Sequence, residues 1–342
     1  MKTRKIIIDT DPGIDDAVAI IAAAMIPEFE LLGICSVGGN KGIECTTDNA
    51  LRLSAFIGKN TPVFKGAAAS LQPISPDYVR KVPEGLIHGS NGLGEYNPPI
   101  DSTLLQKTPA VDFILESAKK YPDELEIIAL GPLTNLALCI EQDIETMKKI
   151  KAIYSMGGSV YRGNVTPVAE FNYWHDPLAV QTVCQKLGAF TDIFMIGLEL
   201  TAACFMDMNY LSFITNQKTK EAEFISAILP TYIKYNWEIG KTLGVIIHDL
   251  ITVLFAHTPA LCKNIPHVNL QCVCDSEIAR GQTIVDFDAD LCDKNAYVPL
   301  VIDAEALKEN FIRILFKEQG VSEYRDAMHR IQNINRHDFF LS

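Results

Sequence analysis

The feature that most constrains the fold of this chain is an alternation of short apolar runs with longer amphipathic runs over its first 200 residues. In short runs such as Ile6-Ile7-Ile8, both faces of an extended strand would be apolar, which is typical of parallel strands covered on both sides. Strands that alternate with helices predict a parallel sheet with helical crossovers. The predicted strands are Lys5 to Ile8, Glu30 to Val37, Glu126 to Leu130, Ala152 to Met156 and Ile193 to Ile196, and the predicted helices are Asp15 to Met25, Glu44 to Ile57, Leu133 to Ile140 and Pro177 to Lys186.

The rest of the chain continues without a linker or a repeat. Residues 207–257 have a mainly helical pattern, and shorter strands from 267 to 301 precede a closing helix at 304–316. The stretch from Gly66 to Pro99 is too long for an ordinary connection and is predicted to be a functional loop. We therefore expect an α/β fold in which residues 1–318 form one large domain, an open and mostly parallel sheet with helices on both faces. Residues 319–342 are a polar C-terminal tail, either an appended helix or disordered.

Charge and composition narrow the class of partner. Thirty Lys and Arg against 42 Asp and Glu give a net charge of −12, which argues against nucleic acid or an anionic membrane. No uncharged apolar run reaches the ~18 residues of a membrane span, and the N-terminal apolar run is too short for a signal peptide. Nine cysteines without a CxxC pair predict free thiols in a reducing, cytoplasmic location. Small molecules and cations remain as the expected partners.

The first predicted strand ends in an unusual concentration of carboxylates, Asp9, Asp11, Asp15 and Asp16. Close carboxylates repel one another by ~1 to 4 kcal/mol per pair unless a cation lies between them. One helix cap and one turn former would explain two of the four. Because ligands bind at the carboxyl ends of parallel strands, the remaining carboxylates predict a metal site there.

Polar residues also follow the other predicted strands. They are Gly38-Gly39-Asn40, Gly131-Pro132-Leu133-Thr134-Asn135, and Met156-Gly157-Gly158 followed by Asn164, Glu170 and Asn172. Each group alone is compatible with an ordinary turn. Their recurrence at successive strand ends predicts one shared polar site.

Two of the seven histidines have informative neighbours. His248 and Asp249 interrupt what we expect to be a buried helix, although Asp249 could also serve as a helix cap. His88 lies in a glycine-rich loop, where a surface role is equally compatible with the sequence. Oxygen ligands from Asp11, Asp16 and Asp249 would suit Ca²⁺ or Mg²⁺, and a polyhydroxylated ligand such as a sugar would match such a cation.

Seven segments occur in the same order as in one known family: DTDPGIDDAVAI, SVGGN, LIHGSNGLG, ALGPLTNLA, YSMGG, GNVTPVAEFN and VIIHDLITV. Together they resemble the inosine-uridine-preferring nucleoside hydrolases, from about residue 4 to residue 316. The resemblance implies a Rossmann-like fold, a homodimer or homotetramer, and a Ca²⁺ ion held by Asp11, Asp16, the Leu130 carbonyl and Asp249. It implies that ribose is bound by Asp15, Asn40, Asn164, Glu170 and Asn172, and that Met156 and Phe171 line the pocket.

The resemblance also implies the reaction, hydrolysis of the N-glycosidic bond of ribonucleosides to base and ribose in purine or pyrimidine salvage. Ca²⁺ would hold the ribose hydroxyls and the attacking water, Asp11 would be the general base, and His248, aided by His88, would protonate the leaving base. A purine-preferring branch lacks both histidines, so their presence favours a less selective or pyrimidine-accepting enzyme. Trp237 lies on the helix expected to close over the base and leaves base preference open.

Two alternatives have other chemistry. Asp9-Thr10-Asp11 could open a haloacid-dehalogenase-type phosphatase, although that pattern wants Thr or Val where Gly13 stands and the sequence lacks a clear basic phosphate clamp. The chain could also be a catalytically inactive relative that binds a nucleoside or Ca²⁺ without turnover.

Overall fold

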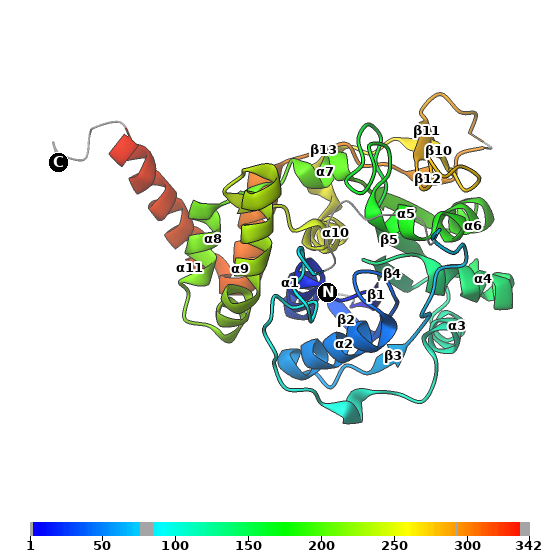
Figure 1. Ribbon diagram of the computed structural model, residues 1–342, viewed down its shortest axis with the longest axis horizontal. Coiled ribbons are helices and arrows are strands. Elements are labelled where there is room, and N and C mark those ends of the chain that lie inside the picture. The colour runs from blue at the N-terminus through cyan, green and yellow to red at the C-terminus, as the bar shows by residue number, and fades with distance from the viewer. Residues whose placement is uncertain (1–2, 76–84, 292, 336–342) are drawn as a thin grey trace.

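The computed structural model describes residues 3–75, 85–291 and 293–335. A nine-stranded sheet forms its centre (Figure 1). Its strands are β1 (Arg4–Thr10), β2 (Phe29–Ser36), β3 (Val63–Lys65), β4 (Leu125–Ala129), β5 (Ala152–Met156), β6 (Asp192–Ile196), β10 (His267–Cys272), β11 (Thr283–Asp286) and β12 (Ala296–Tyr297). Two small sheets pair β7 (Met206–Asp207) with β8 (Gly244–Val245), and β9 (Cys262–Asn264) with β13 (Val301–Ile302).

The order across the large sheet is β11-β10-β12-β6-β5-β4-β1-β2-β3. All neighbours from β3 to β12 are parallel, and β10 and β11 add an antiparallel edge. β1 lies between β2 and β4, and its Asp9 pairs with Cys35 of β2 and Ala129 of β4. The carboxyl ends of three adjacent strands therefore lie together, which is where an open parallel sheet binds ligands.

Helices cover both faces of the sheet. They are α1 (Ile14–Met25), α2 (Ile43–Ile57), α3 (Ala110–Lys120), α4 (Thr134–Met147), α5 (Phe171–His175), α6 (Pro177–Leu187), α7 (Leu198–Ala202), α8 (Met208–Thr215), α9 (Lys220–Gly240), α10 (His248–His257) and α11 (Ala304–Asn335). Ile6 and Ile8 of β1 pack with α1, α9 and α10, whereas Ile7 packs with α3, α4 and α6. Figure 1 shows these two groups of helices on opposite sides of the sheet. Because successive side chains of a strand point to opposite faces, an all-apolar strand needs cover on both.

This architecture confirms the predicted α/β fold with a mostly parallel sheet and helices on both faces. Strand ends differ from the predicted ones by a few residues, and β3 and α3 were not predicted. The expectation that His248 and Asp249 interrupt a buried helix is wrong. α9 ends at Gly240, β8 intervenes, and α10 begins at His248, so the pair opens a helix.

The last helix is longer than the predicted closing helix at 304–316. α11 runs to Asn335 and changes direction at Lys317, whose φ is +63°. Beyond this kink, Val321 and Tyr324 are buried against the core, and the Tyr324 ring centroid lies 5.6 Å from that of Tyr210. Apolar contacts therefore hold the first part of the predicted tail as a helix on the domain. Residues 336–342 of that tail lie outside the described residues.

Two other predictions concern the whole chain. Eight cysteines of the described part are free, and six of them are buried; Cys292 lies outside the described residues. Among the helices that the structure describes, none has both the length and the apolar character of a membrane span.

Candidate active site

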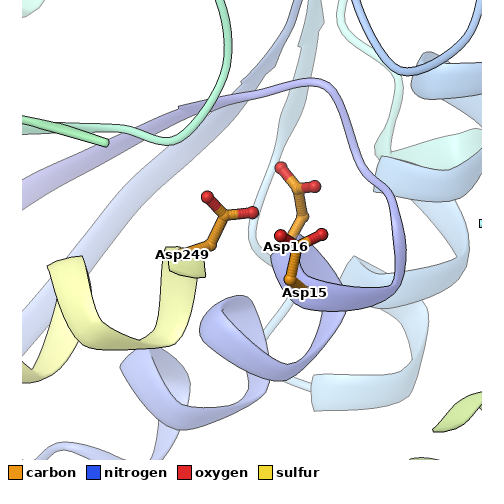
Figure 2. Close-up of side chains that lie close together, drawn as sticks. All are labelled: Asp15, Asp16 and Asp249. Carbon is orange, nitrogen blue, oxygen red and sulfur yellow. The ribbon is translucent and has the colours of Figure 1, made fainter. Parts of the chain in front are cut away.

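Three buried carboxylates meet at the carboxyl end of β1. Asp15 and Asp16 lie in the first turn of α1 and Asp249 lies in the first turn of α10 (Figure 2). Oxygen atoms of the three lie within 4.8 Å of one another. α1 and α10 pack directly against each other, and the N-terminus of a helix favours negative charge. The helix pair therefore concentrates three negative groups at one point.

Asp11 follows β1 beside this cluster. Its Oδ2 accepts a hydrogen bond from the Asn40 backbone N–H at 2.6 Å, and its carbonyl accepts one from Asn40 Nδ2 at 3.2 Å. A Cβ at Gly39 would lie 2.0 Å from Asp11 Oδ2, and one at Gly131 would lie 2.6 Å from Oδ1. Only glycine leaves room at these two positions. Asp11 Oδ1 is buried and has no hydrogen-bond partner among the described residues.

The aspartates strongly perturb one another. Burial and then the charge of Asp16 raise the pKa of Asp11 well above its usual range. Burial raises the pKa of Asp15 to about 6, and burial together with the charge of Asp15 raises that of Asp16 to about 6. Burial and the other three carboxylates raise the pKa of Asp249. Deprotonating this group in a low-dielectric site is costly unless a cation is present.

A hard cation fits these residues. Asp11 Oδ1 and Asp15 Oδ1 are both buried without a hydrogen-bond partner among the described residues, and buried polar atoms normally have one. Oxygen-only donors suit Ca²⁺ or Mg²⁺. Both oxygens of Asp16 accept hydrogen bonds: Oδ2 accepts from the Gly13 N–H at 2.8 Å, and Oδ1 accepts from Thr10. The four aspartates thus combine fixed positions with free ligand atoms.

The ends of β4 and β5 contribute polar groups to the same edge. Leu130 follows β4, and its carbonyl, a predicted metal ligand, accepts a hydrogen bond from Asn172 Nδ2 at 2.7 Å. The same nitrogen lies 3.1 Å from the Met156 carbonyl. Asn172 therefore joins the two strand ends next to Asp11.

Glu170 is the N-cap residue of α5, and its buried carboxylate accepts three backbone hydrogen bonds. Its carboxylate accepts from the backbone N–H groups of Gly158 at 3.0 Å, Asn172 at 2.9 Å and Tyr173 at 3.1 Å. Burial outweighs these bonds and raises its pKa to about 7. The adjacent Asn164 is exposed, and its Oδ1 accepts from the Phe171 N–H at 3.0 Å. The predicted ribose-binding residues of this segment therefore lie together.

The structure places both selected histidines beside the aspartates. His248 precedes Asp249, and its Nδ1 lies 2.8 Å from Thr201 Oγ1. Burial, and then the nearby His88, lower the pKa of His248 to about 4. His88 Nδ1 accepts from the Ile14 N–H at 3.2 Å and lies 3.8 Å from Asp15 Oδ1. The neutral form of His248 therefore predominates at neutral pH.

Helix α9, which is expected to close over the base, carries both Trp237 and Tyr232. The Trp237 side chain is 49% exposed, and Lys241 lies 5.7 Å from the ring centroid. Tyr232 is buried instead, with its ring centroid 6.0 Å from that of His88, and its hydroxyl donates to the Ile246 carbonyl at 3.0 Å. In this structure the aromatic ring of α9 that faces the site is Tyr232.

Several residues support the site although the sequence analysis gave them no individual role. Asn135 Nδ2 donates to Asp9 Oδ1 at 2.6 Å and to the Ser36 carbonyl at 3.1 Å, and Asn135 Oδ1 accepts from the Ala67 N–H at 2.8 Å. One amide thereby holds the ends of β1, β2 and β3 together. Thr201 is a second such residue. Their only sequence signal is a polar residue next to an apolar strand or helix.

Comparison with known proteins gives one consistent result. The family model described as inosine-uridine preferring nucleoside hydrolase matches residues 6–309. Uridine nucleosidase 1 of Arabidopsis thaliana is 36% identical over 290 residues, which cover 83% of this chain and 82% of that protein. The non-specific ribonucleoside hydrolase RihC of Escherichia coli K12 is 33% identical over 300 residues, covering 88% and 93%.

A solved structure agrees with these sequence matches. A plant nucleoside hydrolase, the PpNRh1 enzyme, superposes with a TM-score of 0.84 and 30% identity, covering 91% of this chain and 98% of that one. These matches do not support the alternatives of a phosphatase or of a protein without turnover.

Proposed function

Because the chain belongs to the inosine-uridine preferring nucleoside hydrolase family and is therefore a ribonucleoside hydrolase, we propose that its buried aspartates bind Ca²⁺ and that Asp11 is its general base. The observation that carries this proposal is the group of three buried carboxylates, Asp15, Asp16 and Asp249, with the buried Asp11 beside them and two unpartnered oxygens, on Asp11 and Asp15. Asp11, Asp16, Asp249 and the Leu130 carbonyl would hold the ion. Such a site uses oxygen ligands throughout, as Ca²⁺ requires.

The protein's own groups suit water attack on a ribose. When bound, Ca²⁺ would supply ligand positions for the ribose hydroxyls and lower the pKa of a water molecule. Asp11 Oδ1, which is buried and unpartnered, would accept the proton of the attacking water. Direct attack by water resembles the inverting glycosidases, which pass through an oxocarbenium-like transition state. Negative charge around the ribose would stabilise that state.

Substrate binding follows from the strand ends. Asp15, Asn40, Asn164, Glu170 and Asn172 would bind the ribose hydroxyls. Met156 and Phe171 would line the pocket. The fixed hydrogen bonds of Glu170 and Asn172 support this role because preorganised polar groups do not need to reorient during the reaction.

The departing base needs a proton, and His248 is the proposed donor. Because its neutral form predominates at neutral pH, His248 would donate as an imidazolium that has first taken a proton from solvent. Thr201 Oγ1 lies 2.8 Å from its Nδ1, which leaves Nε2 as the nitrogen that would face the base. His88, whose Nδ1 lies 3.8 Å from Asp15 Oδ1, would assist. General acid catalysis of this kind contributes roughly 10²- to 10⁴-fold.

The substrate range, the cellular role and the oligomeric state are inferred from the family. The presence of both histidines, together with relatives named for uridine and for non-specific ribonucleosides, favours an enzyme that accepts pyrimidine nucleosides. We place it in nucleoside salvage in the cytoplasm, as a homodimer or homotetramer whose catalytic domain is residues 1–318.

Metal depletion tests the proposal. Protein treated with a chelator should release little ribose from uridine or inosine in a reducing-sugar assay, and added Ca²⁺ should restore release because the donors are all oxygen atoms. A variant with a weakened site, Asp249→Asn, should need more Ca²⁺ for the same recovery. The exposed Asp48 provides a matched control, Asp48→Asn. Recovery with Zn²⁺ alone would contradict the proposed ligand set.

A further inference from the structure

One buried amide connects the two loops that carry the site. Asn49 lies on α2 and is 2% exposed. Its Nδ2 donates to the Pro12 carbonyl at 3.1 Å and to the Asn91 carbonyl at 2.9 Å. Pro12 belongs to the turn that carries Asp11, and Asn91 belongs to the loop that carries His88. The two hydrogens of one NH₂ group therefore serve two carbonyls from separate parts of the site.

Hydrogen bonds within the loop of residues 88–97 hold its backbone in one conformation. Asn91 Oδ1 accepts from the backbone N–H groups of Leu93 at 2.9 Å and Glu95 at 3.0 Å, and the Gly94 N–H donates to the His88 carbonyl at 2.9 Å. Leu93 is fully buried in the core. These contacts make the loop a unit with His88 at its start, so a shift at Asn91 moves His88.

The backbone of this loop lies close to the Asn49 side chain. A Cβ at Gly92 would lie 2.7 Å from Asn49 Nδ2 and 3.3 Å from the Pro12 carbonyl oxygen. Gly92 has a φ of +82°, a conformation that favours glycine. The backbone of the loop is therefore shaped to reach the Asn49 amide.

The other end of the connection does not depend on Asn49. The Asp11 turn is also held by the bond from the Gly13 N–H to Asp16 and by the bonds between Asn40 and Asp11. The loop also has other contacts, because the Asn91 carbonyl accepts from Cys45 Sγ at 3.3 Å and His88 Nδ1 accepts from the Ile14 N–H at 3.2 Å. Loss of the Asn49 amide should therefore leave the turn in place and loosen the loop without detaching it.

We propose that Asn49 is a positioning residue that fixes His88 relative to the aspartates by joining the Pro12 and Asn91 carbonyls. This inference rests on the proposed role of His88 at the substrate. The Asn49 amide donates to the backbone carbonyls of Pro12 and Asn91, neither of which is a proposed ligand of the metal or the ribose. Residues that orient the direct participants of a site typically affect activity by about 10- to 100-fold.

A double-mutant cycle tests the proposal. Asn49→Asp keeps the shape of the side chain but removes the NH₂ group, and Asn49→Leu removes it without adding charge. Each should lower kcat/KM for uridine by about 10- to 100-fold. In a His88→Ala background the same changes should lower it by less than about threefold, because residues that act through one another are not additive.

Hydrogen exchange gives a second readout. Peptides within residues 85–99 should exchange faster in the Asn49 variants than in the wild type. Ser54→Ala is the matched control, because it removes another buried side-chain hydrogen bond of α2, to the Thr61 carbonyl, away from both loops. It should change neither exchange in the loop nor kcat/KM. Gly92→Ala disturbs the same contact from the side of the loop. It therefore tests the proposal even if both Asn49 variants fail to fold.

The outcomes separate this inference from the proposed function. Equal losses with and without His88, or unchanged exchange in residues 85–99, would overturn the role of Asn49. If His88→Ala alone left kcat/KM unchanged, the proposed role of His88 would be wrong. Hydrogen exchange would then still decide whether Asn49 holds the loop.

Discussion

At the scale of single residues, the roles proposed for Asp11 and His248 are opposite with respect to protons. Asp11 has an unpartnered buried oxygen that would accept the proton of the attacking water, and His248 has an imidazole whose Nδ1 lies 2.8 Å from Thr201 Oγ1. The first would act on the nucleophile and the second on the leaving group. Substrates that differ only in their leaving group can therefore separate the two.

We expect His248→Ala to lower turnover of inosine or uridine by roughly 10²- to 10⁴-fold, the usual contribution of a positioned proton donor. Hydrolysis of a nitrophenyl riboside should stay within about tenfold of the wild type, because nitrophenolate leaves without protonation. Asp11→Asn should impair both substrates alike. Steady-state kinetics on the two substrates measure this. Equal slowing of both by His248→Ala would instead assign His248 to the orientation of Asp249.

At the scale of elements, the turns after the strands decide the shape of the site. The turn after β2 brings Gly39 so close to Asp11 that a Cβ would lie 2.0 Å from Oδ2. Three residues later, Gly42 precedes α2 and has no atom within 4 Å of its Cβ position. A side chain is therefore excluded by Asp11 at Gly39 but has free space at Gly42.

Gly39→Ala should therefore displace Asp11 and lower kcat/KM for uridine by at least about tenfold, since a small misplacement of a catalytic group is costly. Gly42→Ala is the matched control and should retain wild-type activity. Both values come from the reducing-sugar assay. Similar activities for the two variants would show that the contact at Gly39 does not position Asp11.

The elements also show how far the sequence could predict this molecule. β1 and β4 were predictable because their all-apolar runs can only be buried strands. The short β3 was not, because three residues give no usable period. Asp11 was predicted to lie at a metal site because several carboxylates at one strand end repel one another unless a cation lies between them. Asn135 was predicted only as part of a polar strand end, without a role of its own. Asn49 was not predicted at all, because a single amide in a helix has no pattern and its role depends on loops that are distant in sequence.

At the scale of the whole molecule, the two ends of the sheet have opposite electrostatics. At the amino end of β1, Glu126 is buried and accepts from Arg4 Nε at 3.0 Å and Lys151 Nζ at 2.8 Å. Burial alone would raise the pKa of Glu126, but the hydrogen bonds and charges of Arg4 and Lys151 outweigh it and lower that pKa. At the carboxyl end, oxygen atoms of three aspartates instead lie within 4.8 Å of one another, and His88 Nδ1 lies 3.8 Å from Asp15 Oδ1. Ion pairs therefore stabilise the amino end of β1, whereas the crowded carboxylates at its carboxyl end favour the binding of a cation.

The lowered pKa makes the contribution of Glu126 to stability depend on pH. It is present above the ordinary glutamate pKa of ~4.3 and is lost as the pH falls through the lower folded value. Glu126→Gln should lower the free energy of unfolding by about 1–3 kcal/mol at pH 7. The difference from the wild type should shrink below about pH 4. Urea unfolding at both pH values measures this, and a pH-independent difference would contradict it.

The aspartate cluster is proposed to act on the hydroxyls of a ribose. The most direct test of this role is the release of sugar from uridine and from 2′-deoxyuridine by the same Ca²⁺-loaded protein. We predict ribose release from uridine and a kcat/KM for 2′-deoxyuridine that is lower by at least roughly 10²-fold, because one hydroxyl that would bind at the cluster is missing. Equal values for the two nucleosides, or no release of ribose from uridine and inosine, would contradict the account.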